Sequence, residues 1–215
     1  YYLNGMLFEV GKDYLRLVAT DGHRLAMETV SLESALEDTQ QQILPRKGVV
    51  ELSRLLNEEG GDITLTFGQN HIRAKEPEFT FTSKLVDGKF PDYNRVLPKG
   101  GNKAVIGDCQ ELRQAFARAS ILSNEKYRGV RVMLAEDEMR ILANNPDQEE
   151  AEEAVAVEYS GESLEMGFNV SYPIDVLSTL SSKRARITLS DPNNSALLEG
   201  EEGGDALYVV MPMRL

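Results

Sequence analysis

The stretch Phe168-Asn-Val-Ser-Tyr-Pro-Ile-Asp-Val-Leu-Ser-Thr-Leu180, followed by Ala185-Arg-Ile-Thr-Leu189, decides the fold because the chain contains it in two versions. The earlier version is Leu44-Pro-Arg-Lys-Gly-Val-Val-Glu-Leu-Ser-Arg-Leu-Leu56, followed by Asp62-Ile-Thr-Leu-Thr66. In both, a strand leads into a segment whose apolar residues have helical spacing, and an alternating strand follows. This repetition predicts two similar structural units.

A second pair of matching stretches precedes each version. Tyr127-Arg-Gly-Val-Arg-Val-Met-Leu134 and Met139-Arg-Ile-Leu-Ala143 match Tyr2-Leu-Asn-Gly-Met-Leu-Phe8 and Tyr14-Leu-Arg-Leu-Val-Ala19. The second copy also has a leading strand and helix, 104–126, with no counterpart in the first, so we expect the first copy to be truncated. The Pro and paired Gly of 97–102 predict a linker, which gives a central domain 1–101 and a C-terminal domain 102–215.

Short alternating runs dominate the rest of the chain, and they predict strands. They lie at 15–19, 25–29, 63–67, 79–82, 130–134, 139–143, 155–159, 187–189 and 208–211. Only three stretches have helical spacing, namely 47–56, 109–120 and 172–180. Many strands with few, isolated helices predict an α+β fold with antiparallel sheets.

Composition excludes several classes of protein. The 215 residues include 41% hydrophobic and 27% charged residues, which is typical of a globular chain, and no apolar run approaches the length of a membrane helix. One cysteine, Cys109, excludes a disulfide framework within the chain, and two histidines leave little for a metal centre. With no secretory signal in view, the lone thiol indicates a reducing cytoplasm.

Catalytic motifs are absent from the sequence, including nucleotide-binding glycine loops, zinc-protease motifs and nucleophile elbows. Cys109 lies at the start of a predicted helix, where the helix dipole lowers a thiol pKa, but a structural role is the more frequent one. Asp21-Gly22-His23-Arg24 is best interpreted as a turn, with ligand contact or acid–base chemistry as the alternatives.

Charge is distributed unevenly along the chain. The net charge is −12, yet 45–57 carries +2 and the stretches 109–126 and 171–184 carry +1 each. These helices are either ordinary solvated faces or one electropositive surface that meets phosphates without reading sequence. The acidic run 148–153 is either a solvated face or half of a charge-complementary interface.

The chain ends in Tyr208-Val-Val-Met-Pro-Met-Arg-Leu215, which is either a final strand or a groove lined by adaptable methionines. With this ending, the strings Ala19-Thr-Asp-Gly-His-Arg-Leu-Ala26, Phe81-Thr-Ser-Lys-Leu-Val-Asp-Gly-Lys-Phe-Pro-Asp-Tyr93 and Arg95-Val-Leu-Pro98 closely resemble the bacterial DNA polymerase III beta subunit family, the sliding clamps. So do Leu44-Pro-Arg-Lys-Gly48, Ile121-Leu-Ser-Asn-Glu-Lys126, Asn144-Asn-Pro146 with the acidic run 148–153, and Gly167-Phe-Asn-Val-Ser-Tyr172. The resemblance covers the whole chain and corresponds to the second and third of the family's three domains.

The resemblance implies a non-catalytic processivity factor that needs no cofactor. Clamps of this family are head-to-tail homodimers whose repeated domains close a ring around duplex DNA, with helices lining the hole and sheets forming the outer wall. The ring tethers the polymerase III catalytic subunit, and the clamp loader, other polymerases and repair proteins dock through short linear peptides. Duplex DNA is bound without sequence preference, and no membrane is involved.

The resemblance also implies three sets of site residues. The peptide-binding groove between the two domains comprises Leu3, Thr20, Gly22, His23, Arg24, Leu25, Pro91, Arg95, Val96, Asn169, Tyr172, Ser195, Val209, Met211, Pro212, Met213, Arg214 and Leu215. The DNA-facing residues are Tyr1, Tyr2, Arg46, Lys47, Arg54, Arg113, Arg118, Lys183 and Arg184. The dimer interface comprises Ile121, Leu122, Glu149, Glu150, Glu152 and Glu153.

Two rival functions remain open from sequence alone. A nuclease or transferase would use Asp21 with His23, and it would require a metal or nucleotide site that the sequence does not display. A protein-interaction scaffold without DNA would form no ring.

Overall fold

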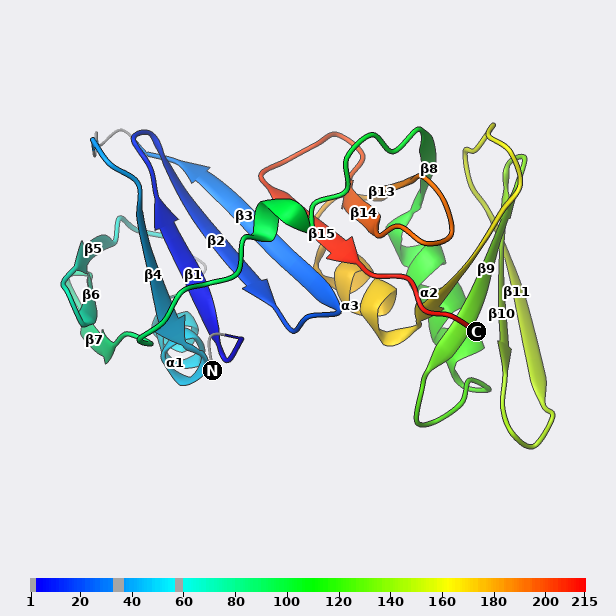
Figure 1. The fold of residues 1–215 in the computed structure, drawn as a ribbon, viewed down its shortest axis with the longest axis horizontal. Coiled ribbons are helices and arrows are strands. Elements are labelled where there is room, and N and C mark those ends of the chain that lie inside the picture. The colour runs from blue at the N-terminus through cyan, green and yellow to red at the C-terminus, as the bar shows by residue number, and fades with distance from the viewer. Residues whose placement is uncertain (1–2, 33–36, 57–59) are drawn as a thin grey trace. The chain divides into compact units, whose positions relative to one another are not determined.

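The computed structural model describes residues 3–32, 37–56 and 60–215. The chain divides into two compact units, 1–93 and 94–215, which we call unit 1 and unit 2 (Figure 1). The division lies earlier than the boundary expected after Gly101, because 94–101 belongs with unit 2. Gly101, for example, lies so close to Thr188 that an added Cβ would come within 2.6 Å of its methyl group.

Unit 1 contains a four-stranded antiparallel sheet in the order β4-β1-β2-β3 and a three-stranded sheet β5-β6-β7. Its strands are β1 (Gly5–Val10), β2 (Tyr14–Thr20), β3 (Arg24–Ser31), β4 (Gln40–Pro45), β5 (Thr64–Phe67), β6 (His71–Lys75) and β7 (Thr80–Lys84). Helix α1 (Arg46–Leu55) follows β4 directly, and the 3₁₀ helix η1 (Tyr93–Arg95) begins where the unit ends.

The core of unit 1 lies where α1 and the small sheet meet the larger one. Phe8 of β1 and Leu44 of β4 are buried there together with Leu52 of α1 and Ile72 of β6. Alternation along β1 therefore turns Phe8 toward α1 and turns its neighbours Leu7 and Glu9 to the opposite face of the sheet.

Unit 2 contains a four-stranded antiparallel sheet in the order β11-β10-β9-β12, and the strands β8, β13, β14 and β15 pair consecutively. The strands are β8 (Lys103–Asp108), β9 (Gly129–Ala135), β10 (Glu138–Asn144), β11 (Glu150–Ala156), β12 (Leu164–Asn169), β13 (Arg184–Leu189), β14 (Ala196–Gly200) and β15 (Ala206–Val210). Helices α2 (Cys109–Ser120) and α3 (Ser171–Thr179) pack against each other and contribute to one large core.

The repeat predicted from the sequence appears as the same strand order in both units. The order β4-β1-β2-β3 corresponds to β12-β9-β10-β11, and α1 corresponds to α3. The registers agree as well, because Met6 pairs with Leu44 as Val130 pairs with Phe168. Strand β8 and helix α2 have no counterpart among the described residues of unit 1.

The expected α+β class with antiparallel sheets is confirmed, and the three predicted helices are present with ends shifted by at most one residue. The strand expected at 155–159 was misplaced, because β11 covers Glu150–Ala156 and includes most of the acidic run. Its glutamates obscured the strand pattern, although Ala151 and Val155 point inward at alternate positions. Strands β6 and β14 match none of the expected runs, whereas β4 and β12 are the strands expected to lead into the repeated helices.

Candidate functional site

The turn between β2 and β3 holds most of the expected groove residues of unit 1. Gly22 has a φ of +90°, which a residue with a side chain rarely adopts. The Asp21 carboxylate accepts hydrogen bonds from the backbone N–H of His23 and of Arg24 at 2.9 and 3.0 Å, and it forms an ion pair with the Arg24 guanidinium. The interpretation of 21–24 as a turn is therefore confirmed, and the His23 side chain is exposed at its tip.

Electrostatics at this turn do not favour acid–base chemistry. Burial by itself raises the pKa of the Asp21 carboxyl, but the hydrogen bonds from His23 and Arg24 and the Arg24 charge outweigh burial, so the pKa is lowered. An aspartate held ionised in this way stabilises the turn rather than taking up a proton near neutral pH.

The C-terminal tail, residues 211–215, continues beyond β15 along the four-stranded sheet of unit 2. The Met213 N–H donates to the Gly167 carbonyl at 2.7 Å. Leu215 lies against Gly129 and Gly167, where an added Cβ would come within 2.5 Å and 2.8 Å of its side chain. The two glycines therefore admit the tail, whose last residue remains 59% exposed.

Two hollows in unit 2 bring expected groove residues together. The larger, about 870 Å³, is lined by Met213, Arg214 and Leu215 of the tail together with Tyr127 and Leu142. The smaller, about 480 Å³, is lined by Arg95, Val96, Lys99, Ser190, Asn194 and Ser195. Tyr127, Leu142 and Lys99 were not expected at a site, and their sequence context gives no signal for it.

The remaining groove candidates differ in accessibility. Leu3 is 41% exposed and Pro91 is exposed, whereas the side chains of Leu25 and Val209 are 3% and 1% exposed. Asn169 accepts the Ser171 N–H at the start of α3. The others, Thr20, Tyr172, Met211 and Pro212, are half-buried.

The expected DNA-facing cations fall into two groups. Arg46, Lys47, Arg113 and Lys183 are exposed. Arg118 donates two hydrogen bonds to Glu153, Arg184 pairs with Glu158 and Glu201, and Arg54 pairs with Glu51. The carboxylates partly neutralise this second group, and Tyr1 and Tyr2 lie outside the described residues.

Four of the six expected interface residues lie on or beside one edge strand of unit 2. Strand β11 is the edge strand of its sheet and carries Glu150, Glu152 and Glu153, while Glu149 precedes it. Glu152 pairs with Arg140, and Glu149 accepts a hydrogen bond from the Asn145 side chain. Ile121 is 76% exposed after the last turn of α2, and Leu122 is half-buried.

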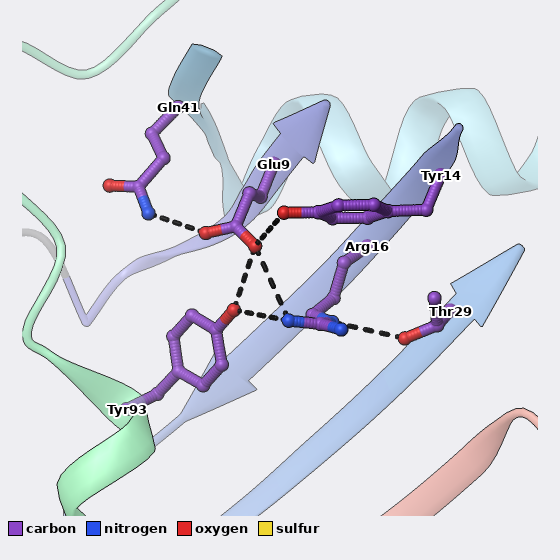
Figure 2. A network of polar contacts seen from close by, with 6 residues as sticks. All are labelled: Glu9, Tyr14, Arg16, Thr29, Gln41 and Tyr93. Atoms are coloured by element: carbon purple, nitrogen blue, oxygen red, sulfur yellow. Dashed lines mark hydrogen bonds and ion pairs between the residues drawn. The ribbon is translucent and has the colours of Figure 1, made fainter. Parts of the chain in front are cut away.

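A polar network in unit 1 was missed by sequence reasoning. The carboxylate of Glu9, which is 5% exposed, accepts hydrogen bonds from Tyr14, Arg16, Gln41 and Tyr93 (Figure 2). A signal was available in the sequence, because Glu9 is a lone acidic residue in the apolar run Met6 to Val10 of a strand.

Metal and thiol chemistry find no support in the described part of the chain. Residues 3–32, 37–56 and 60–215 contain no group of three or more His, Cys, Asp or Glu side chains that could hold a metal ion. Burial and the nearby Asp108 raise the pKa of the Cys109 thiol, so the lowering that a helix start would cause does not occur. No helix in these ranges is long and apolar enough to cross a membrane.

Both units match models of known domain families. Residues 94–214 match the family described as DNA polymerase III beta subunit, C-terminal domain, and residues 1–92 match its central domain. The boundary between the two matches falls beside the division between the structural units.

Curated proteins and solved structures agree with these matches. The chain is 60% identical over 215 residues to the beta sliding clamp of Pseudomonas putida and 54% identical over 217 residues to that of Escherichia coli. It covers 59% and 58% of the lengths of these proteins. A crystal structure of the Pseudomonas aeruginosa sliding clamp bound to griselimycin is 60% identical and matches all of this chain and 58% of that one, with a TM-score of 0.98.

Proposed function

The chain belongs to the DNA polymerase III beta subunit family, and on this premise we propose that it acts in the cytoplasm as part of a sliding clamp. The clamp encircles duplex DNA and tethers the replicative polymerase and other partners without catalysing a reaction. The observation that carries the proposal is the 60% identity to a beta sliding clamp over the full length of the chain. The chain spans only 59% of that relative, so the ring involves more than the residues described here.

Short partner peptides dock, in this proposal, on the expected groove residues of both units. The exposed Leu3 and Leu215 and the half-buried Met211 and Met213 supply apolar contacts for leucine and phenylalanine anchors. Griselimycin bound to the Pseudomonas aeruginosa clamp shows that a relative of this chain takes a ligand. Few apolar anchors and little buried area predict modest affinity with a weak dependence on salt.

A titration tests peptide docking on this chain. A fluorescently labelled partner peptide with leucine and phenylalanine anchors is titrated by fluorescence polarisation, and griselimycin is added as competitor. We expect Met213→Ala to weaken binding roughly fivefold and deletion of 211–215 to abolish it, because an anchor contact is lost. Met133→Ala is the matched control, since Met133 is a half-exposed methionine of unit 2 outside the expected groove.

Unchanged binding after the tail deletion, in a protein that circular dichroism shows to be folded, would place the peptide site elsewhere. If, in addition, griselimycin fails to displace the bound peptide, the peptide site of this chain differs from the site at which griselimycin binds the relative.

Duplex DNA is contacted, in this proposal, by the exposed cations Arg46, Lys47, Arg113 and Lys183, with Arg118 and Arg184 contributing less because carboxylates pair with them. Contacts to phosphates alone predict binding that ignores sequence and weakens as salt rises. Arg46→Glu with Lys47→Glu is expected to weaken binding of a duplex equally for all sequences. A clear preference for one duplex at fixed salt would contradict backbone contact.

Ring closure is assigned, in this proposal, to the edge strand β11 and to Ile121 and Leu122. The opposite face in family clamps belongs to a first domain, and the matched family models cover only the central and C-terminal domains. We therefore expect a polypeptide limited to residues 1–215 to be monomeric in light scattering. A dimer that persists on dilution would refute the assignment.

A further inference from the structure

The Glu9 carboxylate links β1 to three other segments of the chain. Tyr14 and Arg16 lie on β2, Gln41 lies on β4, and Tyr93 is the first residue of η1. The Glu9 Oε1 atom accepts from the hydroxyls of Tyr14 and Tyr93 at 3.0 and 2.8 Å, and Oε2 accepts from Gln41 (Figure 2). A carboxylate buried to this extent is stable only when such donors surround it.

Tyr93 is the member of this network that lies outside the sheet. Its hydroxyl donates a hydrogen bond to Glu9 and accepts one from Arg16 Nη1 at 2.9 Å. Both partners of the hydroxyl therefore belong to the sheet (Figure 2). Its side chain is 3% exposed. A 3₁₀ helix of three residues has little hydrogen bonding of its own, and the Tyr93 hydroxyl ties this one to the sheet.

Unit 2 lacks the network at the equivalent place. The pair Glu9–Arg16 of unit 1 corresponds in register to Met133–Arg140 of unit 2. Met133 is 38% exposed, and Arg140 pairs with Glu138 and Glu152 at the surface. The four-stranded sheet therefore forms without this network in unit 2. In unit 1 the network includes Tyr93, the last residue before unit 2 begins.

We propose that Glu9 and Tyr93 are positioning residues for peptide docking, because they fix the segment that carries three expected groove residues. Pro91 lies two residues before Tyr93, and Arg95 and Val96 lie two and three residues after it. Arg95 and Val96 also line the smaller hollow of unit 2. This inference rests on the proposed peptide-binding function.

Affinity is the quantity that a positioning role changes. When a docking segment occupies its competent conformation only part of the time, the apparent affinity falls in proportion to that fraction. A segment that is competent one fifth of the time binds about fivefold more weakly without any change in the residues that touch the peptide.

Two tyrosines allow a matched test. Tyr93→Phe and Tyr14→Phe each remove one hydroxyl that donates to Glu9 Oε1, but only Tyr93 lies on η1. Peptide affinity is measured by fluorescence polarisation, and amide hydrogen exchange is measured over residues 91–97. We expect Tyr93→Phe to weaken binding roughly three- to tenfold and to speed exchange over this segment, with Tyr14→Phe changing neither by more than about twofold.

The possible outcomes distinguish failure of the positioning role from failure of the proposed peptide-binding function. If the parent binds the peptide and the two variants bind equally well, the positioning role is refuted and the network serves stability alone. If both variants lose affinity to the same extent, the effect is a general loss of folding, and the positioning role is again refuted. A parent chain that binds no peptide contradicts the proposed function itself, and the exchange data then still show whether Tyr93 anchors η1.

Discussion

The four-stranded sheets of the two units share one strand order but differ on the face turned away from α1 and α3. In unit 1, the residues Leu7, Val18 and Met27 lie side by side on that face and are buried. Their counterparts in unit 2 are Arg131, Leu142 and Glu152, and both charged residues are exposed. The same strand order is therefore compatible with either an apolar or a charged face of the sheet. The residues at alternate positions of the strands decide which of the two is present.

In both units, the chain segment that follows the last strand returns to the four-stranded sheet. In unit 1 the Val86 N–H donates to the Ile43 carbonyl, and the chain continues to Tyr93 and its network. In unit 2 the Met213 N–H donates to Gly167 at the equivalent position, two residues before the last residue of the chain. The corresponding surface of unit 2 contains the larger hollow.

The largest expected effect concerns α2, which has no counterpart among the described residues of unit 1. Leu112 of α2 is 0% exposed, and Leu112→Ala should lower the free energy of unfolding of unit 2 by about 3–4 kcal/mol, because it leaves a cavity in the core. Leu52→Ala in α1 of unit 1 should cost less, since Leu52 is 7% exposed and belongs to a smaller core. Urea unfolding with hydrogen exchange resolved by unit measures both, and equal losses would contradict the difference.

An exchange of equivalent residues tests the two sheets directly. Glu9→Met introduces at this position the methionine that unit 2 has at the equivalent Met133. It should lower the free energy of unfolding by about 2–3 kcal/mol, because Arg16 and two tyrosine hydroxyls lose their acceptor. Met133→Glu places a carboxylate beside the exposed Arg140, and it should change stability by less than about 0.5 kcal/mol. Denaturant midpoints measure both variants, and similar values for the two would show that Glu9 is not special to unit 1.

The smallest effect is expected from pH. Burial raises the pKa of Glu9, but the bonds from Gln41, Tyr93 and Tyr14 and the charge of Arg16 outweigh it and lower the pKa. The stability that Glu9 contributes is thus present above the ordinary glutamate pKa of about 4.3 and is lost as pH falls through the lowered value.

Melting temperatures between pH 7 and pH 3 measure this dependence. Glu9→Gln should be less stable than the parent at pH 7, and the difference should shrink toward pH 3. Burial and the neighbouring Glu9 raise the pKa of Tyr14, whose contribution is lost only at high pH, above about 10. A constant difference between the two proteins across the acid range would contradict the role of the Glu9 charge.

Much of the fold could be predicted because repetition and periodicity are local properties. The apolar spacing of Cys109–Ser120 predicted α2 with the observed ends, and the matching strings around Leu44 and Phe168 predicted two similar units. Strand β11 was expected too late in the sequence, because its glutamates hide the alternation in which Ala151 and Val155 point inward. A residue pattern indicates a strand only when its buried positions are clearly apolar.

The sequence by itself determined the α+β class, the two repeats and the family, because each depends on residue order alone. Only the tertiary structure decided which charges are paired. Arg118 meets Glu153 across 35 positions of the chain, and Glu9 meets Tyr93 across 84. Such contacts depend on how distant segments are brought together, and no local pattern records them, since the energy of a buried charge is set by its neighbours in space.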